Sequence, residues 1–160
     1  QTPMDRLDAF RAMVAEDGLR TREEWVLGSD WTADAAARDS ADLLSRPDRP
    51  TAVVAASDEM AIGVRESARH LGLEVPRDLS IIGIDDFMLS EVLGLTTVRQ
   101  DVAGQGRAAA ELLLAALLEG HERREELVMP TELVVRESTG PAPGQFTVPS
   151  GSESSSGSRR

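Results

Sequence analysis

The hydrophobic positions along the chain switch repeatedly between helical and strand-like spacing. Apolar residues at intervals of three and four predict helices, whereas short β-branched or continuous apolar runs predict strands. The helices expected on this basis cover residues 4–17, 33–44, 59–71 and 101–119, and the strands cover 25–27, 51–56, 79–84, 96–99 and 132–135. Strands that alternate with helices of this length are typical of right-handed βαβ units. The predicted fold class is therefore α/β, with a doubly wound parallel sheet.

Composition and charge narrow the class of protein. A length of 160 residues suits one domain with its own core. The formal net charge of −11 argues against a nucleic-acid surface, because phosphate binding needs clustered Lys or Arg. No run approaches the roughly 20 apolar residues of a membrane helix, so we expect no membrane contact.

The two ends of the chain differ from its middle. The chain starts at Gln1 and is in a helical pattern almost at once, so we expect it to be truncated at its amino end. From Pro141 onward Pro, Gly and Ser dominate, and such a segment cannot bury enough apolar surface to offset its ordering entropy. We therefore expect a domain at residues 1–139 and a disordered tail at 140–160.

Polar residues follow three of the expected strands. They form the pairs Asp30-Trp31, Ser57-Asp58 and Asp85-Asp86. Because parallel strands point the same way, these pairs should share the carboxyl edge of the sheet, where open α/β sheets bind ligands. Carboxylates and a hydroxyl can bond to ligand hydroxyls or amines, and an indole face can stack on a ring. Taken singly, Ser57 or Asp58 can equally cap the next helix, and Trp31 can be a core residue.

Several motifs follow one another in the second half of the chain. They are PTAVVAASDEMAIGVRESARHLGLEVPRDLSIIGIDD from Pro50, LTTVRQDVAGQGRAAAELLLAALLEG from Leu95, and MPTELVVREST from Met129. In order and spacing they resemble the carboxyl half of bacterial regulators of the lactose-repressor/galactose-repressor (LacI/GalR) family. The earlier DRLDAFRAMVAEDGL is similar to a helix of the same family. The likeness covers roughly residues 4 to 139.

The resemblance implies a two-lobed, periplasmic-binding-protein-like sensor of type I that holds a ligand between its lobes. Most of the chain would form the carboxyl-side lobe, with residues 101–130 crossing to the amino-side lobe. The strands of that second lobe, and the helix-turn-helix headpiece that binds operator DNA, would be missing from this incomplete fold.

Five ligand-binding residues follow from the resemblance, position by position: Arg6, Trp31, Ser57, Asp85 and Gln100. Arg6 would reach ligand hydroxyls or a carboxylate, and Trp31 would stack on the effector ring. Asp85 would accept hydrogen bonds from sugar hydroxyls, and Gln100 would line the cleft at the crossover between lobes. Ser57 stands where the family usually has Asn, so it offers no bidentate amide.

Other candidate chemistry is weak. Gly104 to Ala109 fits G-x-G-x-x-A, but the acidic residue of a dinucleotide site is not placed at the end of a second strand, so we expect the glycines to serve helix packing. His70 and His121 are isolated from any partner at metal or catalytic spacing. Asp85 and Asp86 are adjacent and would point to opposite faces, and we assign Asp86 to structure, as an acceptor of backbone N–H groups at the turn. We expect no enzyme, no cofactor and no metal.

An apolar group of residues predicts an interface. Ile62 lies off the core stripe of its helix, and Phe87, Met88, Leu89 and Leu93 make a loop that is unusually apolar for a surface. The loop can fold onto its own domain, but exposed apolar patches are typical of interfaces, and the resemblance implies a homodimer through this region.

The expected function is therefore the effector-sensing and dimerisation part of a cytoplasmic transcriptional regulator. Its effector would be a sugar or a nucleoside-like molecule, and it would reach operator DNA only through the missing headpiece. Two alternatives remain open: a periplasmic sugar-binding protein of a transporter, and a degenerate fragment that binds no ligand.

Overall fold

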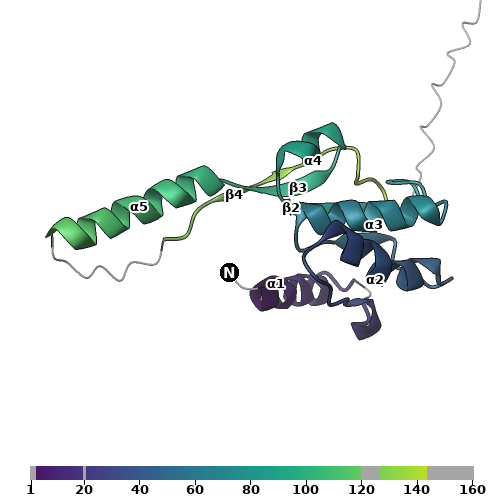
Figure 1. The fold of residues 1–160 in the computed structure, drawn as a ribbon. Helices are drawn as coiled ribbons and strands as arrows, with labels where there is room; N and C mark the ends of the chain where they lie inside the picture. Colours follow the sequence, from purple (N-terminus) through teal and green to yellow (C-terminus); the bar gives the residue numbers. More distant parts are fainter. Residues whose placement is uncertain (1–2, 20, 120–126, 144–160) are drawn as a thin grey trace, which may run out of the picture.

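The computed structural model describes residues 3–19, 21–119 and 127–143. Its elements are, in order, α1 (Pro3–Glu16), η1 (Glu23–Trp25), α2 (Ala33–Ser45), β1 (Ala52–Val54), α3 (Asp58–His70), β2 (Ser80–Asp85), α4 (Met88–Val92), β3 (Thr96–Gln100), α5 (Val102–Glu119) and β4 (Thr131–Val134) (Figure 1). The four long helices and the four strands of the sheet lie where the apolar spacing predicts them, which confirms the α/β fold class.

The sheet is mixed, although we predicted a wholly parallel one. Its strand order is β1-β2-β3-β4, and β1, β2 and β3 run parallel. β4 runs antiparallel to β3, with Val98 opposite Leu133 and Gln100 opposite Thr131. α5 continues beyond the end of β3 and away from the sheet (Figure 1), and β4 runs back along β3 in the opposite direction.

The prediction of a strand at residues 25–27 is wrong. A single 3-10 turn forms instead, in which Trp25 N–H donates to the Arg22 carbonyl at 3.0 Å. The Arg22 guanidinium lies over the Trp25 ring at 5.1 Å and also pairs with Asp48. A strand needs a neighbour for its backbone hydrogen bonds, and in the described part of the chain β1 pairs only with β2. β-Branched and aromatic residues alone therefore did not make a strand here.

The loop predicted around residue 88 is a short helix, α4. Ser90 N–H donates to the Phe87 carbonyl at 2.9 Å, and Leu93 N–H donates to the Leu89 carbonyl at 2.9 Å. Gly94 ends the helix with φ of +60°, a backbone region that favours glycine. Too few turns are present for the apolar spacing to reveal a helix of this length.

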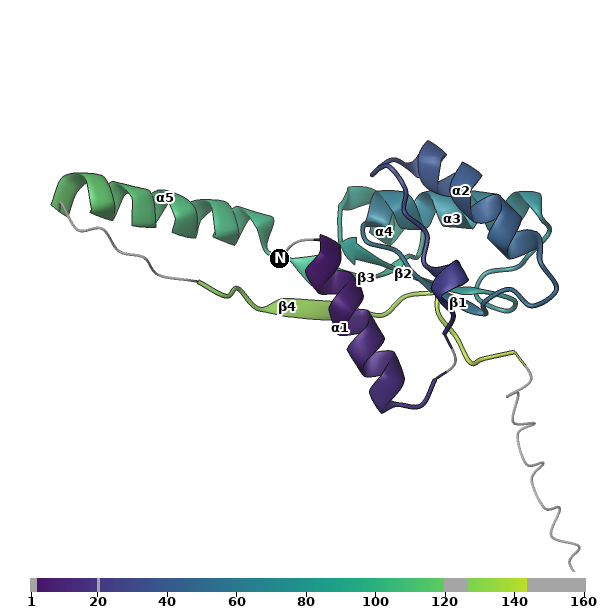
Figure 2. The same ribbon diagram turned by 90° about the horizontal axis from the view of Figure 1, so that it is seen from below.

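The core lies between α3, the sheet and α2. It contains Leu44, Ala55, Ala61, Val64, Ala68, Leu79, Ile81 and Leu95, all buried. Small residues let the two helices approach closely: a Cβ at Gly63 would overlap the carbonyl of Ala33. Figure 2 shows α2 and α3 on one side of the strands and α1 on the other, as in a doubly wound fold.

The segment after β4 closes the body. The Ser138 hydroxyl donates to the Ile81 carbonyl at 2.6 Å and accepts from Thr96 N–H at 2.8 Å, so it joins β2 to β3. Gly140 N–H donates to the Ser80 hydroxyl at 3.1 Å, which extends the ordered contacts one residue beyond the predicted boundary at 139. Most of the predicted tail, residues 144–160, lies outside the described residues.

α5 projects from the sheet as a separate arm (Figures 1 and 2). Within the described ranges, every helix falls short of the length and apolarity that a membrane crossing requires.

Candidate ligand-binding edge

The carboxyl ends of β1 and β2 lie side by side. Val54 on β1 is opposite Ile82 on β2, and the strands are parallel. Ser57 and Asp85, which follow β1 and end β2, are therefore brought to one edge of the sheet, as predicted from the strand pattern.

Asp85 is the centre of this edge. Its Oδ1 accepts a hydrogen bond from Gln100 Nε2 at 2.9 Å, so the ends of β2 and β3 are joined. Burial, and after it the negative charge of Asp58, raise the pKa of Asp85 above its ordinary value, although the Arg6 charge and the hydrogen bonds oppose the shift. Asp85 also has φ of +129°, which is rare for a residue with a side chain and is typical of functional sites.

Arg6 reaches the same edge from α1. Its Nη1 donates to the Ala56 carbonyl at 2.7 Å, fifty residues away in the sequence. Its positive charge acts on the Asp85 carboxylate. Arg6, Asp85 and Gln100 therefore come together from α1, β2 and β3, as three of the five predicted ligand residues.

Ser57 occupies the edge with its hydroxyl already engaged. Ser57 Oγ accepts a hydrogen bond from Met60 N–H at 3.2 Å and caps α3. The residue is buried. The capping role that the sequence left open is thus the one its side chain performs in this structure.

Trp31 lies just before α2 and is 47% exposed. Thr32, the next residue, caps α2 by accepting from Ala35 N–H at 3.2 Å. Ala33 N–H donates to Glu59 Oε1 of α3 at 3.4 Å, which places this loop beside the first turn of α3. The Trp31 indole is therefore accessible near the ligand edge, but it is positioned by a loop and not by the end of a strand as predicted.

Among the described residues, the Asp86 carboxylate is bound by guanidinium groups and by no backbone N–H, contrary to our assignment. Its two carboxylate oxygens bind Arg99 Nε at 2.6 Å and Arg136 Nη2 at 2.7 Å, and Arg99 also reaches Glu132 of β4. Burial would raise the pKa of Asp86, but the two guanidinium groups lower it below its ordinary value. Asp86 is structural, as predicted, but through ion pairs that sequence spacing could not reveal.

In the glycine motif at the start of α5, Gly104 lies at the helix cap rather than in the helix packing that we expected. Asp101 Oδ1 accepts from Gly104 N–H at 2.8 Å, and a Cβ at Gly104 would overlap the Asp101 carboxylate. A capping role explains Gly104 without any bound nucleotide.

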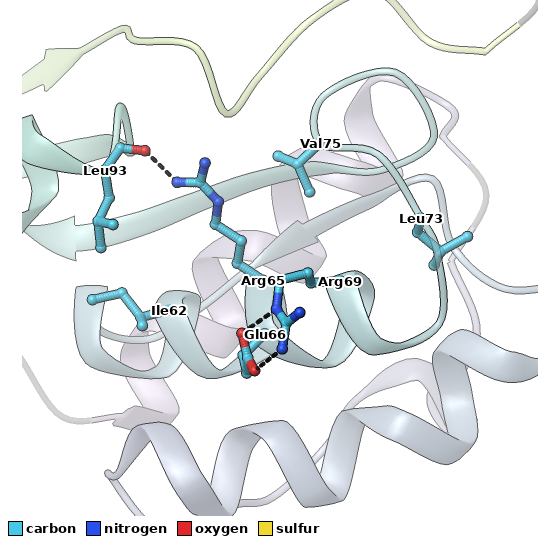
Figure 3. Close-up of a pocket in the computed structure, with 7 residues that line it drawn as sticks. All are labelled: Ile62, Arg65, Glu66, Arg69, Leu73, Val75 and Leu93. Carbon is cyan, nitrogen blue, oxygen red and sulfur yellow. Dashed lines mark hydrogen bonds and ion pairs between the residues drawn. The ribbon is translucent and has the colours of Figure 1, made fainter.

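The predicted interface residues form a surface on α3 and α4. On α4, Met88 is 83% exposed and Leu89 45%, and Phe87 just before the helix is also exposed. Beside them lies a pocket of about 390 Å³, lined in part by Ile62, Arg65 and Leu93 (Figure 3). The Arg65 guanidinium donates to the Leu93 carbonyl at its rim. Ile62 and Leu93 thus line one pocket, whereas Phe87, Met88 and Leu89 are exposed on or just before α4, and we call these five residues the α4 patch.

An open α/β sheet with carboxylate, guanidinium and amide groups gathered at its carboxyl edge is the architecture of a small-molecule-binding domain. Residues 1–139 match the family described as periplasmic binding protein-like domain, and the chain belongs to that family.

Three relatives of the chain are transcriptional regulators. Over 135 residues the chain is 33% identical to the HTH-type transcriptional repressor PurR of Vibrio vulnificus (strain CMCP6), a match that covers 83% of this chain and 40% of that protein. A LacI family transcriptional regulator from Mycobacterium smegmatis is 39% identical, with a TM-score of 0.76 over 85% of this chain and 52% of that chain. A LacI family regulator from Arthrobacter sp. FB24, in complex with lactose, is 30% identical, with a TM-score of 0.74 over 83% of this chain and 50% of that chain. The resemblance to the carboxyl half of LacI-type regulators is confirmed, and the chain spans about 40% of the curated relative.

Proposed function

We propose that the chain is the effector-sensing region of a LacI-type transcriptional regulator and that it binds a sugar at the carboxyl edge of its sheet. One observation carries the proposal. The Asp85 carboxylate accepts a hydrogen bond from Gln100 and lies within the influence of the Arg6 charge, and the three residues belong to three separate elements. The lactose complex of the Arthrobacter relative supports a sugar as the class of ligand.

The chemistry of the edge suits sugar hydroxyls. A carboxylate accepts from hydroxyls, whereas guanidinium and amide N–H groups donate to them, and an exposed indole such as Trp31 can cover the apolar face of a sugar ring. Asp85, Arg6 and Gln100 supply both kinds of partner within one edge. Ser57 contributes only by sharing the hydroxyl that caps α3.

Gln100 gives the site a route to the rest of the protein. It ends β3 directly before α5, and its amide is bonded to Asp85. A ligand that binds Asp85 competes with this bond and so favours a different placement of the arm. Such a ligand shifts a population between states in proportion to its differential affinity for them. We propose that the arm packs in a second, amino-side lobe and that this shift changes lobe closure.

DNA binding belongs to other parts of the regulator. A net charge of −11 opposes contact with phosphates, so operator DNA would be bound by a separate headpiece. We further propose that the regulator works in the cytoplasm, without catalysis, as a homodimer. The α4 patch supports the dimer because it combines exposed apolar side chains with an adjacent pocket.

Thermal unfolding with added sugar tests the ligand site. Lactose, cellobiose, ribose and sucrose are added separately to the purified chain, and the melting temperature is followed. We expect at least one sugar to raise it, and Asp85→Ala to abolish the rise. Asp39→Ala, which removes an exposed carboxylate of α2, is the matched control and should respond like the wild type. An unchanged rise in Asp85→Ala would contradict the assignment of the site.

A further inference from the structure

Asp58 is a charged residue with no exposure to solvent. Its Oδ2 accepts from the Ser90 hydroxyl at 2.5 Å and from Phe87 N–H at 3.3 Å, and its Oδ1 accepts from the Thr97 hydroxyl at 2.5 Å. Burying a carboxylate costs free energy unless hydrogen bonds compensate it, and here three donors do so. They come from α4, from the residue that precedes it, and from β3.

A fourth element makes room for this carboxylate. Gly83 of β2 lies against it, and a Cβ there would overlap Asp58 Oδ1. α3, β2, β3 and α4 therefore meet at one buried side chain. The sequence left Asp58 as a cap or a ligand contact, but Ser57 makes the cap bond and the Asp58 side chain points into the protein.

Thr97 links the Asp58 side chain to the ligand edge. The Thr97 hydroxyl, which donates to Asp58, also accepts from the N–H of Asp86 at 3.3 Å, and Asp86 directly follows Asp85. The negative charge of Asp58 also acts on the Asp85 carboxyl. One carboxylate is thus joined to the end of β2 through Thr97 and to α4 through Ser90.

We propose that Asp58 is a positioning residue that couples the ligand edge to the α4 patch. Its carboxylate positions the end of β2, and so Asp85, through Thr97 and the close approach of Gly83, and it positions α4 through Ser90. A ligand that binds Asp85 then acts on the α4 patch through Asp58. The coupling rests on the proposed function, whereas the positioning of Asp85 and of α4 can be measured without any ligand.

The test uses Asp58→Asn, which keeps the shape of the side chain and removes its charge. The titration of the Asp85 carboxyl is followed by carbon-13 NMR in the chain, and backbone amide exchange is followed in α4. We expect the Asp85 midpoint to move to lower pH, because a nearby negative charge is gone. The substitution leaves the other charged groups around Asp85 in place, namely Arg6 on α1, Asp86 and Arg99 on β3. The shift of the Asp85 midpoint therefore reports the loss of the Asp58 charge. Exchange of the α4 amides should become faster, because an Asn side chain offers one acceptor oxygen where the carboxylate offers two.

Two buried serines provide a matched pair. Ser90→Ala removes a donor to Asp58 and should speed α4 exchange while the charge of Asp58 stays in place. Ser67→Ala is the control, because Ser67 is buried on α3 and its hydroxyl has no hydrogen-bond partner within the described residues. An unmoved Asp85 midpoint in Asp58→Asn would overturn the proposal, and so would α4 exchange in Ser90→Ala that matches Ser67→Ala. If Asp58→Asn does not fold, the serine pair decides.

A measurement with added lactose distinguishes the coupling proposal from the proposed function. Where lactose raises the melting temperature of the wild type, it should change α4 exchange in the wild type and leave it unchanged in Asp58→Asn. The same change in both proteins would overturn the coupling. If lactose and the other three sugars leave the wild type unaffected, the proposed function fails, and the Asp85 titration and the serine pair still decide the role of Asp58.

Discussion

The body of the molecule and its arm contain similar apolar residues in opposite environments. In the body, which consists of α2, α3 and β1 to β3, Leu44 and Leu79 are 2% exposed or less. In the arm, which is α5, Leu117 is 70% exposed and Leu118 is 82% exposed. Apolar periodicity therefore identifies a face that needs a partner, whereas only tertiary contacts tell which partner covers it.

The largest expected effect separates the two regions by stability. Leu79→Ala should lower the free energy of unfolding by about 2–5 kcal/mol, because it leaves a cavity in a closely packed core. Leu117→Ala removes the same atoms from a side chain that is mostly exposed, so we expect a change within about 0.5 kcal/mol. Urea unfolding followed by circular dichroism measures both. Equal losses in the two variants would show that the arm has its own buried contacts in solution.

The body was predictable because its sequence signals are local. The spacing of small and branched residues places β1, α3 and β2, and Gly83 and Gly94 fall where a close approach and a positive φ require them. The strand prediction at residues 25–27 was wrong because a strand also needs a neighbouring strand to pair with, and that requirement is not visible in the local sequence.

The candidate edge was predictable in part. Because β1 and β2 are parallel, residues 57 and 85 had to share an edge, and the structure brings them there. The ion pairs of Asp86 with Arg99 and Arg136 were not predictable, because they join residues 13 and 50 positions apart with no periodic signal. The role of Asp58 was hidden in the same way, since its donors Ser90 and Thr97 lie 32 and 39 positions away.

A second prediction asks which exposed apolar surface a second copy covers. Met88 of the α4 patch and Leu118 of the arm have nearly equal exposure, 83% and 82%. Met88→Glu should weaken self-association about tenfold or more, because a charge is then buried at the interface. Leu118→Glu adds the same charge and should leave self-association unchanged, since we assign the arm to the second lobe. Sedimentation equilibrium of both variants measures the dissociation constants.

The opposite ranking would reverse the assignment of the two surfaces. If Leu118→Glu alone weakens self-association, then copies associate through their arms, and the α4 patch is not the interface.

The smallest expected effect concerns the joint between body and arm, where Asp85 and Asp86 lie side by side with opposite electrostatics. The pKa of Asp86 is lowered in the fold, so its contribution to stability is present above its unfolded pKa and is lost as the pH falls through the folded pKa. The pKa of Asp85 is raised, so its contribution is present below its unfolded pKa and is lost as the pH rises through the folded pKa. At neutral pH, Asp86→Asn should therefore destabilise the chain and Asp85→Asn should stabilise it.

Urea unfolding of both variants between about pH 3 and about pH 7 measures these differences. The Asp85 difference should shrink first as the pH falls, because its raised pKa lets the wild-type carboxyl take up a proton early. The Asp86 difference should shrink later, as the pH approaches the lowered folded pKa of Asp86. A carboxylate that is held at a cost in stability is typical of a binding site, because it gains its partner only when a ligand arrives. If Asp85→Asn instead destabilises the chain as Asp86→Asn does, then the hydrogen bond from Gln100 and the charge of Arg6 already stabilise the Asp85 carboxylate. In that case Asp85 and Asp86 both serve to hold the arm to the body.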